Sequence, residues 1–88
     1  MKKPAAARRS RVPFSVTVFF SADGFSEKRL LALDEIATAH GARRLAEPAV
    51  HCGEVGIEYR LPGAAAPGLA GAFHKLKGSE VLVAREDQ

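Results

Sequence analysis

Apolar and polar residues alternate along two segments of the chain, residues 14–20 and residues 54–61. A period of two is the pattern of a β-strand that buries one face, and the β-branched and aromatic content of both segments agrees with it. An Asp-Gly turn signal follows the first segment and a Pro-Gly signal follows the second. The pattern therefore predicts two half-buried strands.

Two other segments repeat their apolar residues at helical spacing. The first begins after a capping serine, Ser26, and ends before Gly41. The second begins at Pro67, which suits a first helical turn, and ends before Gly78. The two apolar stripes consist of Leu30, Leu33, Ile36, Ala37, Leu69, Phe73 and Leu76. Each stripe predicts one amphipathic helix.

Weaker strand signals lie at residues 42–47, where Leu45 is expected to point inward before Pro48 ends the strand, and at residues 81–83. The full order is then strand, helix, strand, strand, helix, strand. Right-handed crossovers make the strands of each strand-helix-strand unit parallel and leave both helices on one face. The sequence therefore predicts an α+β, ferredoxin-like βαββαβ two-layer sandwich with a four-stranded antiparallel sheet, formed by residues 12–88 as a single domain.

This arrangement defines an expected core and an expected open face of the sheet. The expected core consists of Phe14, Val16, Val18, Phe20, Leu30, Leu33, Ile36, Val55, Ile57, Tyr59, Leu69, Phe73, Leu76, Val81 and Val83. The expected open face carries Ser15, Thr17, Phe19, Glu58, Arg60 and Leu82. Because this face mixes polar and apolar residues, it is available for pairing with another protein.

The basic charge of the chain is concentrated at its start. The 88 residues include 13 Lys and Arg and 10 Asp and Glu, a net charge of +3. Five of the cations lie in the first eleven residues: Lys2, Lys3, Arg8, Arg9 and Arg11. From residue 12 onward, 8 basic residues face 10 acidic ones, a net charge of −2. We expect residues 1–11 to form a disordered basic arm that either solubilises the domain or contacts nucleic acid or another anion.

The single cysteine, Cys52, cannot form an intramolecular disulfide, so a reducing cytoplasm is the expected location. The basic start followed by residues 12–22 also has the form of a signal peptide, but Pro13, Ser15 and Thr17 interrupt its apolar stretch. No stretch approaches the ~20 apolar residues of a transmembrane helix, so no membrane span is expected.

Histidine and cysteine are the residue types to test for metal binding or nucleophilic chemistry. His51 and Cys52 are adjacent, so their side chains diverge in an extended loop, and His74 adds no recognised ligand spacing. A nucleophilic Cys52 would need a base, for which His51 is the local candidate, and an orienting group that the sequence does not identify. Asp34 and Glu35 fit a solvated helix face. We therefore expect no enzymatic activity, no catalytic residue, no metal and no cofactor, with a thiol or metal-dependent activity at His51 and Cys52 as an alternative.

RNA-recognition domains share the predicted order of elements and stack bases on aromatic residues of the open face. In this chain Tyr59 falls in the inward register, and Phe19 is the aromatic residue that faces outward. Contact with nucleic acid is therefore expected through the arm and not through the sheet.

Three stretches of the chain resemble a known group of regulatory domains. They are Val16-Thr17-Val18 leading to Asp23-Gly24-Phe25, then Glu54 to Arg60, and finally Leu76 to Val81. These stretches are similar to ACT-type regulatory domains, in particular the ACT-like C-terminal domains of MgtC-family membrane proteins. The resemblance implies dimerisation and, as in amino-acid-binding members, a ligand held near the first loop and helix. It points to Asp23, Gly24 and Phe25 as ligand-binding residues.

These observations favour a small non-enzymatic regulatory or interaction module of ACT-like type. We expect it to act as a homodimer, or by binding a partner protein or a small-molecule ligand. The alternative from a different class is a nucleic-acid-associated protein that uses the basic arm.

Overall fold

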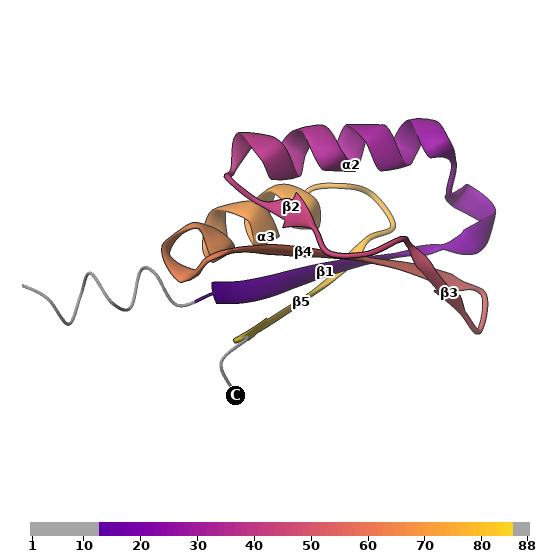
Figure 1. Ribbon diagram of the computed structural model, residues 1–88. Helices are drawn as coiled ribbons and strands as arrows, with labels where there is room; N and C mark the ends of the chain where they lie inside the picture. The colour runs from indigo at the N-terminus through magenta and orange to yellow at the C-terminus, as the bar shows by residue number, and fades with distance from the viewer. Residues whose placement is uncertain (1–12, 86–88) are drawn as a thin grey trace, which may run out of the picture.

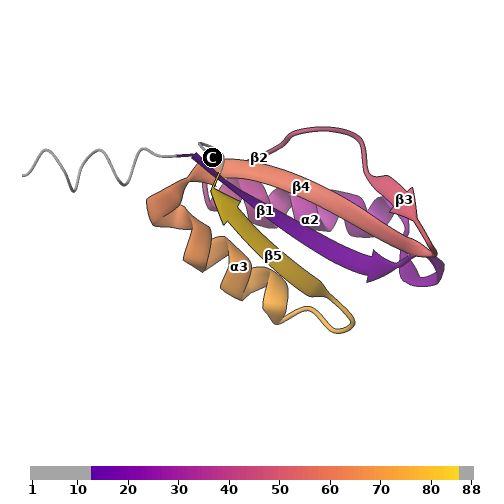
Figure 2. The same cartoon turned by 90° about the horizontal axis from the view of Figure 1, so that it is seen from below.

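The computed structural model describes residues 13–85, which fold into a two-layer α+β sandwich (Figure 1). One layer is an antiparallel sheet, and the other consists of α2 (Glu27–Ala39) and α3 (Ala66–His74). Both helices lie on the same side of the sheet, and Figure 2 shows its other side uncovered by them. The predicted fold class is confirmed, whereas the predicted arm lies outside the described residues.

The sheet is built around β1 (Pro13–Ser21), which pairs with β4 (Glu54–Pro62) on one side and β5 (Glu80–Arg85) on the other. The strand order is β2-β4-β1-β5, and all of these pairings are antiparallel. In β4, buried and less buried residues alternate, as the period of two predicts. The two strands with the clearest alternation thus form the middle of the sheet.

The predicted strand at residues 42–47 is wrong in its extent. Its place at the sheet edge is divided between β2 (Arg43–Arg44) and β3 (Ala49–His51), which pair separately with β4, so the sheet is not a plain four-stranded ferredoxin sheet. The N–H of Leu45 still donates to the carbonyl of Glu58 at 2.9 Å, but the Leu45 side chain is 41% exposed instead of pointing inward. Pro48 has no N–H to continue the ladder. The chain therefore stops pairing with β4 after Leu45 and pairs with it again at Ala49, where β3 begins.

Both ends of α2 form as the sequence predicts. The Ser26 hydroxyl accepts a hydrogen bond from the Arg29 N–H at 3.2 Å, which satisfies one of the free donors of the first turn. At the other end Gly41 adopts a φ of +79°, and Nδ1 of His40 lies 3.0 Å from the Ile36 carbonyl. These contacts define the two ends of α2. The start of α2 borders the candidate site.

The core lies between the sheet and the two helices. Most of its expected members are buried or partly buried, but Val83 is 43% exposed because β5 is an edge strand. Six buried residues were not in the expected core: Ser15, Ala37, Ala42, Leu61, Ala66 and Ala70. Ser15 was expected on the open face and is 5% exposed. Four of the six are alanines, whose burial depends on how closely a helix or turn approaches the sheet. No helix within residues 13–85 is long and apolar enough to cross a membrane.

Candidate functional site

A notch with a volume of about 350 Å³ lies beside the first turns of α2. Its lining residues are Gly24, Ser26, Lys28, Arg29, Ala32, Leu33, Ile36 and Leu76. Leu33, Ile36 and Leu76 give it an apolar wall that belongs to the edge of the core. Lys28 and Arg29 add two cations from consecutive positions of the helix. The notch therefore combines positive charge with apolar surface.

A smaller hollow of about 100 Å³ adjoins this notch and shares Gly24 and Arg29 with it. Its other side is formed by the turn after α3, where Lys77 and Gly78 lie. The guanidinium carbon of Arg29 is 4.9 Å from the centroid of the Phe20 ring, a cation–π contact. This contact holds the Arg29 charge at the boundary between the two hollows. Lys77 extends the positive surface to a second segment of the chain.

Of the three predicted ligand-binding residues, only Gly24 lines the notch, and Asp23 and Phe25 are its neighbours in the sequence. Asp23 and Gly24 belong to the short 3-10 turn η1 (Ala22–Gly24), and Gly24 borders both hollows. Asp23 is exposed, and its N–H donates to the Ser21 hydroxyl at 3.3 Å. Phe25 packs against the core. Sequence reasoning missed Lys28 and Arg29, although their place in the first turn after the Asp-Gly signal could have indicated them.

The candidate metal and thiol residues are exposed and lie in different elements. His51 ends β3, Cys52 occupies the following turn with a φ of +52°, and His74 ends α3. In the part of the chain that the structure describes, no three His, Cys, Asp or Glu side chains form a group suited to a metal ion. The cations of the arm, Lys2, Lys3, Arg8, Arg9 and Arg11, lie outside the described residues. Within residues 13–85, His51, Cys52 and His74 are therefore not brought together as a metal centre.

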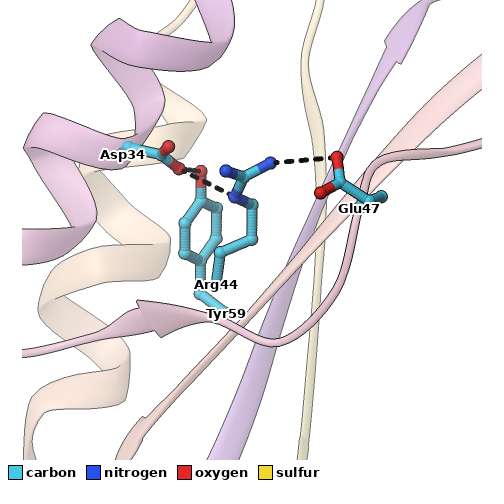
Figure 3. Close-up of polar contacts among 4 residues, drawn as sticks. All are labelled: Asp34, Arg44, Glu47 and Tyr59. Carbon is cyan, nitrogen blue, oxygen red and sulfur yellow. Dashed lines mark hydrogen bonds and ion pairs between the residues drawn. The ribbon is translucent and has the colours of Figure 1, made fainter.

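A polar cluster joins α2 to the edge of the sheet (Figure 3). The Tyr59 hydroxyl donates to Oδ1 of Asp34 at 2.6 Å, and Nε of Arg44 lies 3.5 Å from the same oxygen. Nη1 of Arg44 also lies 3.9 Å from Oε1 of Glu47. Burial of the ring and the hydrogen bond to Asp34 raise the pKa of Tyr59 well above its usual value. The interpretation of Asp34 as part of a solvated face is therefore wrong, because Tyr59 reaches it from the core.

Comparison with models of known protein families gives no match for this chain, and comparison with curated proteins gives no significant match. The charged and apolar surfaces of the notch are therefore the basis for a functional proposal.

Proposed function

We propose that the chain is a small ACT-like regulatory or interaction module that binds an organic anion in the notch beside α2 and catalyses no reaction. The supporting observation is the combination of Lys28 and Arg29 with an apolar wall in a single hollow of about 350 Å³. A guanidinium can pair with a carboxylate through two hydrogen bonds. An apolar group of the same ligand packs against Ile36 and Leu76.

The size and charge of the notch favour a ligand as small as an amino acid. Its volume lies at the lower end of the range of roughly 300–1,000 Å³ found for small-molecule sites. The exposed Asp23 lies outside the lining of the notch but precedes Gly24 in the same turn, so a carboxylate lies beside the notch for an amino group of the ligand. An amino acid with an apolar side chain has all three of the required features: a carboxylate, an amino group and an apolar body.

Titration of the isotope-labelled full chain with leucine, followed by NMR, tests this proposal. We expect the amide signals of Gly24, Arg29 and Leu76 to shift with leucine, and not with leucinamide, which has no carboxylate. Arg29→Gln should weaken binding about tenfold or more, because hydrogen bonds between charged groups contribute about 1.5–3 kcal/mol. Arg43→Gln makes the same charge change on β2, away from the notch, and should leave binding intact.

The proposal fails if no amino acid and no small carboxylate shifts the amide signals around the notch. It also fails if Arg43→Gln weakens leucine binding as much as Arg29→Gln does, because the effect would then come from net charge and not from the notch.

A second observation favours pairing of two copies through β5. Within residues 13–85, β5 pairs with β1 alone, and its Leu82 and Val83 are 57% and 43% exposed. A two-fold axis through Leu82, perpendicular to the sheet, places Leu82 opposite its own copy and Val81 opposite Val83. Glu80 then lies opposite Ala84, so no like charges face each other. We propose that this strand is the dimer interface of the module.

A further inference from the structure

A groove with a volume of about 290 Å³ opens on the face of the sheet that the helices leave uncovered (Figure 2). Its lining comes from β1, from β4 and from the segment that leads from β2 into β3. The lining residues are Thr17, Phe19, Ala46, Glu47, Ala49, His51, Glu54, Gly56 and Glu58. The groove is separate from the notch beside α2, because the sheet lies between them.

The Phe19 ring forms the apolar floor of this groove. Phe19 is paired with Gly56 across β1 and β4, and an added Cβ on Gly56 would lie 3.0 Å from Cε1 of the ring. The ring therefore lies against the glycine of the neighbouring strand, where any other residue would crowd it. Phe19 is half-buried, so part of the ring remains open to the groove that it lines.

Three carboxylates surround the ring. Glu54 and Glu58 lie two positions before and after Gly56 in β4, so all three residues face the same side of the sheet, and each glutamate Cα is about 7 Å from that of Gly56. Glu47 comes from the segment after β2, and its Oε1 lies 3.9 Å from Nη1 of Arg44. Within residues 13–85, no lysine or arginine lines the groove, and no ion pair joins Glu54 or Glu58 to a cation.

We infer that this groove binds an arginine side chain from an extended segment of a partner protein. A guanidinium is flat, so it can stack on the Phe19 ring through a cation–π contact while its N–H groups donate to the carboxylates on either side. A lysine ammonium is a compact and more strongly hydrated charge, with no flat face to place on the ring. The aromatic floor between carboxylates therefore favours arginine over lysine.

The charge of the groove also indicates that the arginine belongs to a polypeptide. Free arginine carries an α-carboxylate, which the three glutamates would repel, whereas within a polypeptide this group is part of a peptide bond. The volume of about 290 Å³ lies at the bottom of the range of roughly 300–1,000 Å³ found for small-molecule sites, which suits a single side chain. For the same electrostatic reason, the partner segment should have no acidic residue beside its arginine.

Titration of the isotope-labelled full chain with the blocked peptide acetyl-Gly-Gly-Arg-Gly-Gly-amide, followed by NMR at low salt, tests the inference. We expect the amide signals of Phe19, Gly56 and Glu58 to shift, and the binding to weaken near 1 M salt, where the Debye length falls to about 3 Å. The same peptide with citrulline in place of arginine keeps the shape but has no charge, so it should bind about tenfold more weakly. A lysine peptide should also bind more weakly than the arginine peptide.

Variants of the chain assign the binding to this groove. E54Q/E58Q should weaken binding of the arginine peptide about fivefold, the combined effect of two exposed ion pairs. Phe19→Leu keeps an apolar residue in β1 but removes the aromatic face, and should weaken binding about threefold. The matched control E27Q/E35Q removes the same charge from exposed positions of α2 and should leave binding unchanged.

Several results would overturn the inference. A lack of shifts at the groove would exclude the site. Equal binding of the arginine and lysine peptides, or equal weakening by E27Q/E35Q and E54Q/E58Q, would reduce the contact to net charge. Free arginine that binds the groove as tightly as the blocked peptide would point to a small molecule instead of a partner protein. Because the blocked peptide has no free carboxylate, its result is independent of the leucine titration of the notch.

Discussion

A hydrogen bond from the Tyr59 hydroxyl to Asp34 connects the sheet to the helical layer. The Tyr59 ring is 1% exposed and lies 5.5 Å from the Phe73 ring, while Oδ1 of Asp34 accepts from the hydroxyl at 2.6 Å. Tyr59→Phe keeps the ring and removes this hydrogen bond to a carboxylate. We expect the free energy of unfolding to fall by about 2 kcal/mol, measured by urea denaturation at pH 7. Equal stability of the two proteins would contradict the role of this bond.

The same two proteins should respond differently to alkaline pH. The folded protein raises the pKa of Tyr59, whereas the unfolded chain releases this proton near pH 10. Above about pH 10 the unfolded state therefore binds fewer protons, and the stability of the natural protein falls by about 1.4 kcal/mol per pH unit more than that of Tyr59→Phe. Urea denaturation at several pH values checks this. Parallel pH profiles would show that burial does not hold the proton on Tyr59.

At the scale of the helices, two glycines should respond in opposite directions to the same substitution. Gly41 ends α2 with a φ of +79°, which an alanine adopts at a cost of about 1 kcal/mol or more. Gly71 lies inside α3, and an added Cβ there would have no heavy atom within 4 Å. We expect Gly41→Ala to lower the free energy of unfolding, measured by urea denaturation, because of its positive φ. Gly71→Ala should raise the free energy of unfolding by about 0.5–1 kcal/mol through helix propensity. A loss of stability in both would contradict this reading of α3.

The elements with strong periodicity could be predicted from the sequence, and the edge of the sheet could not. β4 buries alternate residues, and β1 does so from Val16 to Phe20, because both strands have neighbours on each side and a helical layer above one face. The segment between Ala42 and His51 has a single neighbouring strand, and Pro48 interrupts its ladder. Whether such a segment pairs continuously depends on the path of the loop. Composition carries little information on that path.

The candidate sites show the same division between local and long-range information. The turn at Asp23 and Gly24 could be predicted because it depends on adjacent residues. The approach of Leu76 and Lys77 to Arg29 could not, since it depends on how α3 packs beside α2. The contact between Tyr59 and Asp34 spans 25 positions and was missed for the same reason. A helix periodicity identifies a polar face but not the partner that a polar side chain meets.

For the molecule as a whole, the small negative net charge from residue 12 onward is the sum over two surfaces of opposite sign. Lys28, Arg29 and Lys77 gather on the helical side, where they line the notch and its smaller neighbour. Carboxylates gather on the open face of the sheet, around Phe19. The two-layer architecture keeps these surfaces apart, because the sheet lies between them. Net charge alone would suggest a nearly neutral and uniform surface, whereas the fold separates a cationic surface on one side from an anionic surface on the other.

Dimerisation through β5 would preserve both surfaces, since the edge strand belongs to neither. We expect Leu82→Lys to abolish dimers at tens of micromolar, because it places a charge opposite its own copy at the two-fold axis. Leu31→Lys is the matched control: it makes the same change at a residue of α2 that is 62% exposed, compared with 57% for Leu82. Sedimentation velocity of the natural chain and the two variants measures the outcome. A monomeric natural chain would contradict the interface, and dissociation by Leu31→Lys alone would place the contact on α2 instead of β5.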